Sequence, residues 1–178
     1  MSDKPVLFLD WDRVMNVIPR HYEREKKPET DRPDLRLHNV GNDDSGVYPM
    51  YLSADMGTAM HDLSQRAEFR WLTTWARYAN EILSPIAGFP VPFPVAAHPG
   101  WGMKPWKWYA IEEFLEDEPG RSFVWVDDDA IFPHAETRIL DRLVPPAKSL
   151  LVRTDPYKGI SRSDLKNIDE FLCAEADR

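Results

Sequence analysis

Residues 6–12 read Val-Leu-Phe-Leu-Asp-Trp-Asp. Four apolar residues without polar alternation are typical of a strand that is covered on both faces, as in a parallel sheet. Two carboxylates follow directly, and the carboxyl end of such a strand is where open α/β sheets bind their ligands. The stretch therefore predicts a parallel α/β sheet with an acidic site at one edge.

Similar apolar runs occur at four later places, which are residues 69–73, 94–97, 123–127 and 150–152. Segments with apolar residues at helical spacing lie between them. We expect five helices: one capped by Ser53, one over 75–83 that ends before Pro85, one that begins at Pro105 and ends near Gly120, one around 139–143, and one that begins at a capping box formed by Ser161 and Asp164. Alternating strands and helices predict an α/β fold with a doubly wound parallel sheet.

Residues 19–52 interrupt this alternation. The region is polar, has no helical period, and carries the turn-forming residues Gly41-Asn42 and Asp43 to Gly46. We expect a small flap or cap insertion after the first strand, with residues 35–40 in one arm of a hairpin. The length of 178 residues predicts that 1–178 form a single domain around this insertion.

Composition excludes several classes of protein. The chain has 22 Lys and Arg against 30 Asp and Glu, a net charge of −8, which disfavours nucleic-acid binding through bulk positive charge. A single cysteine, Cys173, rules out an internal disulfide and a thiolate zinc cluster. The amino terminus does not resemble a secretory signal, and the apolar stretch 84–97 contains four prolines and cannot be a membrane helix. We therefore expect a cytoplasmic protein with no membrane partner.

Five carboxylates follow two of the expected strands. Asp10 and Asp12 end the first strand, and residues 127–129 read Asp-Asp-Asp. Parallel strands end at the same edge, so these side chains are expected to converge, and two charges 4 Å apart repel by about 4 kcal/mol at an effective dielectric of 20. Such a cluster requires a cation, and oxygen-only ligands favour Mg²⁺ over zinc.

A hydroxyl and an ammonium group lie between these acids in sequence. Thr73 follows the second apolar run, with Thr74 as the alternative by one residue, and Lys107 or Lys104 opens the third helix. A hydroxyl donor and an ammonium opposite a metal are suited to hold the non-bridging oxygens of a phosphoryl group. The sequence thus predicts a phosphate-ester site.

Several motifs also carry a family resemblance, and in chain order they are Phe8-Leu9-Asp10-Trp11-Asp12, Val14-Met15-Asn16, Trp71-Leu72-Thr73-Thr74-Trp75, Ala79-Asn80, Lys107, Trp125-Val126-Asp127-Asp128, and Leu151 to Pro156 followed by Gly159. Their order resembles the four motifs of the haloacid dehalogenase-like (HAD) superfamily. Within it, the chain is most similar to the small HAD domain associated with Swiss Army Knife RNA repair proteins. The resemblance covers nearly all of the chain except residues 19–49.

The resemblance implies a role for each motif residue. Asp10 stands at the position of a nucleophile that forms an aspartyl-phosphate, and Asp12 matches the residue that protonates the leaving group and later activates water. Thr73 would donate to a phosphoryl oxygen, and Lys107 would neutralise charge on the intermediate. Mg²⁺ would be held by Asp10, the Asp12 backbone carbonyl, Asp127 and Asp128. We expect further substrate contacts from Thr74, Arg13 and Lys104.

One position departs from the family pattern. The glycine that usually follows the second aspartate is Arg13 in this chain. A side chain at this position either blocks the usual turn or binds substrate phosphate, and the sequence leaves both readings open. It also motivates an alternative function, a non-catalytic HAD-fold binding or regulatory module that has lost turnover.

The leading hypothesis is a Mg²⁺-dependent phosphatase that hydrolyses phosphate monoesters through an aspartyl-phosphate on Asp10. Its substrate would be a phosphorylated small molecule, a nucleotide, or an RNA or DNA end. Response-regulator receivers and nucleotide-sugar transferases also use clustered acids at strand ends. The order of Asp10, Asp12, Thr73, Lys107 and Asp127 fits both of these classes poorly.

Overall fold

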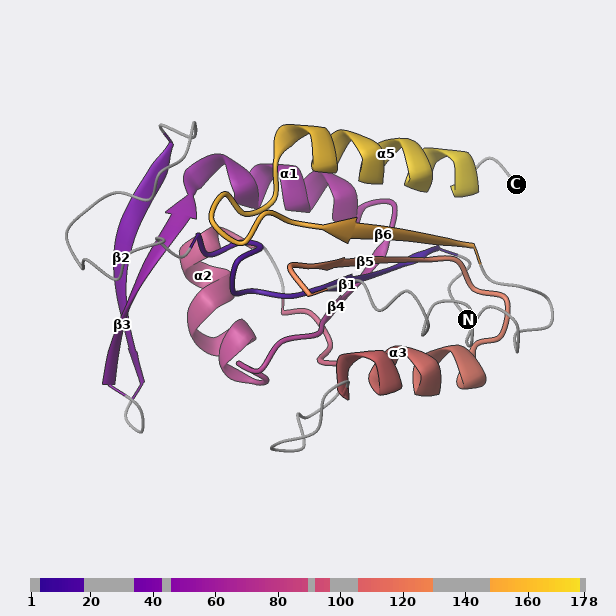
Figure 1. The fold of residues 1–178 in the computed structure, drawn as a ribbon, viewed down its shortest axis with the longest axis horizontal. Coiled ribbons are helices and arrows are strands. Elements are labelled where there is room, and N and C mark those ends of the chain that lie inside the picture. Colours follow the sequence, from indigo (N-terminus) through magenta and orange to yellow (C-terminus); the bar gives the residue numbers. More distant parts are fainter. Residues whose placement is uncertain are drawn as a thin grey trace.

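The computed structural model describes residues 4–17, 34–42, 46–89, 92–96, 106–129 and 148–176. Its central element is a four-stranded parallel sheet of order β4-β1-β5-β6 (Figure 1). The strands are β1 (Val6–Leu9), β4 (Glu68–Trp71), β5 (Phe123–Asp127) and β6 (Ser149–Arg153). The first strand in sequence therefore lies in the interior of the sheet, and its acidic continuation emerges between two neighbours.

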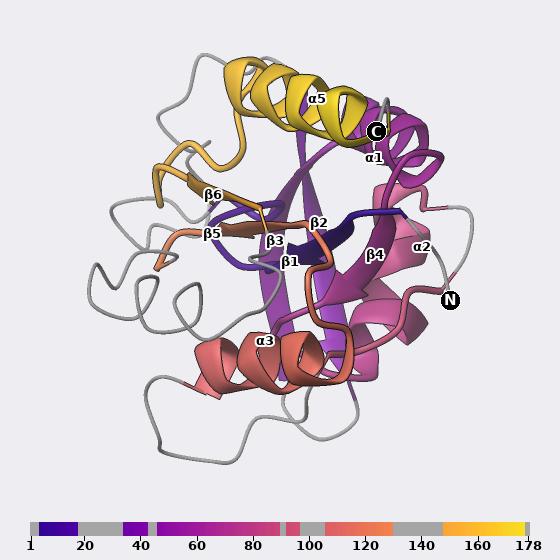
Figure 2. The ribbon, with the colours of Figure 1, turned by 90° about the vertical axis from the view of Figure 1, so that its right-hand side faces the viewer.

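Helices cover both faces of the sheet. Figures 1 and 2 show α1 (Ala54–Ser64) and α5 (Arg162–Ala176) side by side on one face, and α3 (Trp106–Asp117) on the other. This arrangement confirms the predicted doubly wound α/β fold.

Alternation along β1 explains why the sheet is covered twice. Leu7 and Leu9 belong to the hydrophobic cluster that includes residues of α1 and α5, whereas Val6 and Phe8 belong to the cluster formed with α3. All four side chains are buried. Successive residues of a strand point to opposite faces, so an uninterrupted apolar run requires a helical layer on each side.

A separate antiparallel hairpin stands at the carboxyl end of the sheet (Figure 1). It consists of β2 (Leu35–Asn42) and β3 (Gly46–Ser53), in a register that pairs Leu35 with Ser53 and Asn42 with Gly46. The predicted hairpin arm at 35–40 is thus observed, and it extends two residues further. The limits of the insertion at 19–52 and the single domain 1–178 stay predictions.

One predicted strand is absent from the described residues. In the segment 92–96, Val95 forms only an isolated bridge to Trp71, so the strand expected at 94–97 is wrong for the described part. Prolines at 92 and 94 explain this, because they cannot donate hydrogen bonds to a neighbouring strand. The helix expected around 139–143, and Pro105, lie outside the described residues.

The helix expected over 75–83 also differs from the prediction. A π-helix, Ala79–Leu83, continues directly into the short helix α2 (Ser84–Ala87), so Pro85 does not stop it. Pro85 is tolerated because it occupies the first turn of α2, where its missing N–H has no required acceptor. The segment instead ends at Gly88, which adopts a left-handed conformation with φ of 77°.

The two predicted helix caps have different outcomes. Ser53 precedes α1, but its hydroxyl donates to Asp34 and does not cap the helix. At α5 the capping box is confirmed: the Asp164 carboxylate accepts the Ser161 N–H at 2.8 Å, and the Ser161 hydroxyl accepts the Asp164 N–H at 3.1 Å. Within the part of the chain that the structure describes, no helix has the length and apolar character needed to cross a membrane.

Candidate active site

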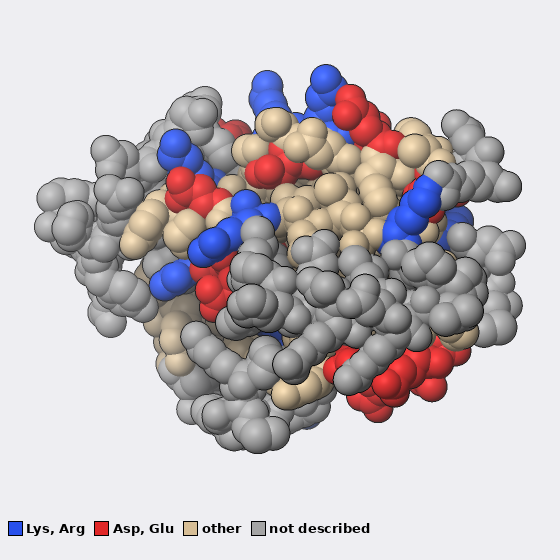
Figure 3. All heavy atoms as spheres, turned by 45° about the vertical axis from the view of Figure 1, so that its right-hand side comes forward, with Lys and Arg blue, Asp and Glu red and all other residues tan. Residues whose placement is uncertain are grey.

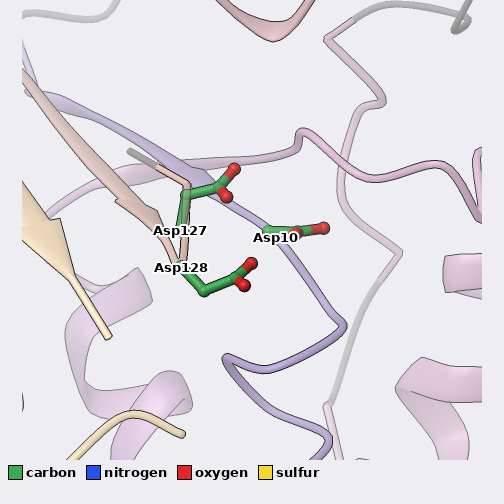
Figure 4. Close-up of side chains that lie close together, drawn as sticks. All are labelled: Asp10, Asp127 and Asp128. Carbon is green, nitrogen blue, oxygen red and sulfur yellow. The ribbon is translucent and has the colours of Figure 1, made fainter. Parts of the chain in front are cut away.

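Three carboxylates meet at the carboxyl end of the sheet. Asp10 follows β1, Asp127 ends β5, and Asp128 is the next residue. One oxygen from each lies within 4.8 Å of the others, and Figure 4 shows the three groups directed into the same space. The parallel pairing of β1 and β5 produces this meeting, because it aligns Leu9 with Val126 and so brings both strand ends to one point. We call Asp10, Asp127 and Asp128 the acidic trio.

Lys107, in the first turn of α3, binds two members of the acidic trio. Its Nζ donates to Asp10 Oδ2 at 2.7 Å and to Asp127 Oδ2 at 2.6 Å. The remaining oxygens accept backbone N–H groups: Asp10 Oδ1 from Trp11 at 2.7 Å and Asp127 Oδ1 from Asp129 at 2.9 Å. The indole N–H of Trp125 reaches Asp127 Oδ2 at 3.2 Å. Both buried carboxylates are therefore fixed in orientation.

The electrostatics of the acidic trio favour an additional cation. Burial, and then the charge of Asp127, raise the pKa of Asp10 to about 7, although Lys107 opposes the shift. Burial lowers the pKa of Lys107, but the charges of Asp10 and Asp127 outweigh it and the net shift is upward. The ammonium is thus firmly protonated, and it does not fully compensate the negative charge around Asp10.

Arg13 binds the third member of the acidic trio. Its guanidinium donates to Asp128 Oδ2 at 3.2 Å, and Arg153 Nε donates to the Asp128 carbonyl at 3.1 Å. Burial raises the pKa of Asp128, and the Arg13 hydrogen bond only partly offsets the shift. Arg13 has φ of 61°, the left-handed region in which glycine is least strained. The turn therefore forms with an arginine, and the Arg13 carbonyl accepts the Thr154 hydroxyl at 2.9 Å.

Asp12 lies in the same turn, and its carboxylate binds two side chains outside the acidic trio. Oδ1 accepts the Asn16 side-chain amide at 2.9 Å, and Oδ2 accepts the Trp75 indole N–H at 2.9 Å. A metal contact by Asp12 was expected through its backbone carbonyl, and this stays a prediction.

The two threonines after β4 differ in environment. Thr73 is fully buried, and its hydroxyl oxygen accepts the Trp75 N–H at 3.5 Å, whereas Thr74 is exposed. Because β4 pairs with β1 up to Trp71 and Leu9, Thr73 follows at the edge where Asp10 lies. Lys104, the alternative to Lys107, lies outside the described residues.

The tryptophans in and before α3 differ in environment. Trp108 is buried and stacks on Trp125, with ring centroids 5.7 Å apart and an interplanar angle of 27°. It is a core residue. Trp106 is half-buried, and Trp101 lies outside the described residues.

The comparison with protein families agrees with this geometry. A family model described as the HAD domain in Swiss Army Knife RNA repair proteins matches residues 6–165. The chain belongs to this family. The resemblance seen in the sequence motifs is therefore confirmed. A search of curated proteins finds no match to the chain.

The residues of this HAD domain fit a divalent cation. The donors are all carboxylate oxygens, which Mg²⁺ prefers, and Mg²⁺ at about 2.1 Å from its ligands holds oxygens within about 4.2 Å of one another. The 4.8 Å limit observed for the acidic trio is close to this span, so small side-chain rotations suffice. Asp10, Asp127 and Asp128 would hold the ion.

Three contacts of the site were not predicted. The motifs containing Asn16 and Trp75 were recognised, but neither residue was assigned a role, although both bind Asp12. The ion pair between Arg13 and Asp128 was also missed. The contacts of Trp75 and Arg13 join segments that meet only in the folded chain, so no spacing rule reveals them. Asn16 lies only four residues after Asp12, and its contact depends on the conformation of the turn.

Proposed function

We propose that this HAD domain is a Mg²⁺-dependent phosphatase that hydrolyses phosphate monoesters through an aspartyl-phosphate on Asp10. The observation that carries the proposal is the acidic trio with Lys107 bound to both Asp10 and Asp127. Family membership supports a HAD-type phosphohydrolase related to RNA repair. When bound by the trio, Mg²⁺ would supply positive charge that offsets the charge of the phosphoryl oxygens.

In the first step, a carboxylate oxygen of Asp10 attacks phosphorus. A bond forms between this oxygen and phosphorus, and the bond from phosphorus to the ester oxygen breaks. The leaving oxygen takes a proton from the Asp12 carboxyl group. Lys107 stays beside Asp10 and offsets negative charge during the transfer, and Thr73 donates a hydrogen bond to a phosphoryl oxygen.

In the second step, water hydrolyses the aspartyl-phosphate. Asp12, now a carboxylate, accepts a proton from water as the water oxygen attacks phosphorus. The bond between phosphorus and Asp10 breaks, and inorganic phosphate leaves. Asp10 and Asp12 return to their starting states, so the cycle needs no further reactant.

Surface charge constrains how a substrate approaches. Acidic side chains gather over α3 (Figure 3), which carries Glu112, Glu113, Glu116 and Asp117. A polyanion is repelled there, whereas Arg13 and Arg153 both bind Asp128 and place positive charge beside the acidic trio. This distribution supports a nucleotide or a nucleic-acid end phosphate as substrate, with Arg13, Thr74 and Lys104 as candidate substrate contacts.

The proposal is tested by phosphate release from the purified chain with Mg²⁺ and an aryl phosphate. The variant Asp10→Asn removes the nucleophile and is expected to lose at least about 10³-fold in kcat. The matched control is Asp117→Asn, the same change at an exposed position on α3, which should retain wild-type activity. Equal activity of Asp10→Asn and the wild type would reject the mechanism.

The substrate class is tested with three phosphorylated compounds. Hydrolysis of a 3′-phosphorylated oligonucleotide, a 5′-phosphorylated oligonucleotide and free mononucleotides is compared at matched concentrations. Preference for one of the oligonucleotides would identify a nucleic-acid end as the substrate. Preference for mononucleotides would identify a nucleotidase.

A second candidate function rests on the ion pair between Arg13 and Asp128. Because a guanidinium occupies one carboxylate of the acidic trio, the chain also fits a binding or regulatory module that keeps the fold without turnover. Rapid hydrolysis of any compound in the substrate panel would eliminate this candidate.

A further inference from the structure

The Asp12 carboxylate is fixed by two side-chain donors from different parts of the chain. Asn16 belongs to the loop after β1 and donates its amide to Oδ1 at 2.9 Å. Trp75 belongs to the loop after β4 and donates its indole N–H to Oδ2 at 2.9 Å. Each carboxylate oxygen therefore has its own donor, and rotation of the group would break both bonds.

Both donors in turn contact the hairpin strand β3. The Asn16 side-chain oxygen accepts the backbone N–H of Tyr51 at 3.0 Å, and the Val17 N–H donates to the Tyr51 carbonyl at 3.2 Å. The ring of Tyr48 packs edge-to-face on Trp75, with centroids 5.7 Å apart and planes at 85°. Two positions of one strand thus support the two groups that hold Asp12.

These contacts determine orientation as well as position. The oxygen and the N–H₂ group of a side-chain amide point in different directions. Because the Tyr51 N–H binds the Asn16 oxygen, the Asn16 N–H₂ group is held toward Asp12. An indole has a single donor, so its hydrogen bond depends on the placement of the whole ring. The Tyr48 ring packs against the Trp75 ring and so helps to hold it in place.

We propose that the hairpin β2–β3 positions the Asp12 carboxylate through Asn16 and Trp75. The hairpin then acts as a structural support of the site in addition to being a flap near it. Tyr48, Asn16 and Trp75 are positioning residues, because they act through Asp12. The catalytic consequence of this arrangement rests on the proposed phosphatase function, whereas the positioning itself does not.

The catalytic consequence depends on the leaving group. Proton donation by Asp12 matters most for a poor leaving group such as an alkoxide, and little for a nitrophenolate. Trp75→Phe keeps an aromatic ring and removes the indole N–H, so it should lower kcat/KM about tenfold for an alkyl phosphate and less than about twofold for p-nitrophenyl phosphate. We use kcat/KM because it excludes the later hydrolysis of the aspartyl-phosphate.

Trp71→Phe is the matched control for this substitution. The Trp71 indole also donates a 2.9 Å hydrogen bond, but its acceptor is Asn80. The control should change both substrates by the same factor. An equal loss on both substrates in Trp75→Phe would mean a merely structural role and would overturn the proposal.

A second measurement does not require turnover. The ¹⁵N-labelled full chain shows indole N–H signals by NMR, and the Trp75 signal is identified by its disappearance in Trp75→Phe. Asp12→Asn and Tyr48→Ala should both shift this signal and speed its exchange with solvent several-fold. Tyr48→Phe keeps the aromatic ring and should leave the Trp75 signal unchanged. Tyr48→Leu replaces the alanine variant if that variant does not fold.

The two measurements separate failure of the inference from failure of the proposed function. If the wild type hydrolyses no phosphate ester, the phosphatase proposal fails, and the NMR comparison still decides whether the hairpin holds Asp12 through Trp75. If the Trp75 signal is the same in the wild type, in Tyr48→Ala and in Tyr48→Leu, the positioning by the hairpin is overturned whatever the activity.

Discussion

Lys107 and Arg13, which both pair with carboxylates of the acidic trio, occupy different environments. The Lys107 side chain is 18% exposed and contacts Asp10 and Asp127, which are 8% and 0% exposed. The Arg13 side chain is 49% exposed, and its guanidinium lies 3.2 Å from a carboxylate oxygen of Asp128, which is 14% exposed. Lys107 thus bridges two buried carboxylates, whereas Arg13 covers one at the solvent boundary.

The difference in exposure predicts that the two cations contribute differently to stability. Removing one partner of a buried ion pair leaves an uncompensated charge and costs several kcal/mol, whereas exposed pairs contribute little because water screens them. We therefore expect Lys107 to stabilise the folded site strongly, and Arg13 to be displaced from Asp128 when another cation binds there.

The largest expected effect follows removal of the buried cation. Lys107→Met should lower the free energy of unfolding by about 3 kcal/mol, because it leaves Asp10 and Asp127 facing each other without a counter-ion. Added Mg²⁺ should restore part of this loss, since an ion bound to the folded state stabilises it. Urea denaturation with and without Mg²⁺ measures both effects.

The matched control for this prediction is Lys166→Met. Lys166 pairs with Glu170 at 3.5 Å on an exposed face of α5, so its loss should cost less than about 0.5 kcal/mol. Equal costs for the two lysine substitutions would contradict the distinction between the buried and the exposed cation.

A smaller effect is expected at Arg13. Arg13→Gly and Arg13→Asn both remove the guanidinium from Asp128, and both residues tolerate a positive φ. Each should bind Mg²⁺ about fivefold more tightly, which corresponds to about 1 kcal/mol for an exposed ion pair that no longer competes. Isothermal titration with Mg²⁺ measures the change, and the substitution Arg13→Lys, which retains a cation, is the control. Unchanged affinity in both neutral variants would show that Arg13 does not compete with the ion.

The smallest effect concerns an ion pair of intermediate burial, far from the acidic trio. Burial raises the pKa of Glu68, but hydrogen bonds from Arg121 and Arg70 outweigh it and hold the pKa below its ordinary value of 4.5. A lowered pKa in the folded state means that this stabilisation is present above about pH 4.5 and is lost as the pH falls through the folded value. Glu68→Gln should therefore cost about 0.5 kcal/mol at pH 7 and nothing well below pH 4. Denaturation curves of the wild type and Glu68→Gln between pH 7 and pH 4 measure this loss in the free energy of unfolding. A loss that grew toward acid pH would contradict the prediction.

Much of the site was predictable because strand ends are visible in sequence. The runs 6–9 and 123–126 are apolar and each is followed directly by an acid, and parallel pairing of two such runs brings Asp10 and Asp127 together. Lys107 was predictable as one of two candidates, because it lies at the start of a recognisable helix. The chemistry of these groups then limits the choice of cation.

Other features could not be predicted from local patterns. Pro85 was taken as the end of a helix, but its place in the first turn of α2 depends on the preceding π-helix, which no apolar spacing indicates. Ser53 has the side chain of a cap, yet its hydroxyl finds Asp34. In both cases a non-local or irregular backbone arrangement overrides a local preference.

The sequence by itself determined the layered α/β fold, the acidic strand ends and the family, because apolar periodicity and motif order are written along the chain. Only the tertiary structure decided which cation faces which carboxylate and which groups hold Asp12. The physical reason is that Arg13 meets Asp128, and Trp75 meets Asp12, across long separations in the chain. Such contacts depend on the register and packing of whole elements, which a linear pattern does not record.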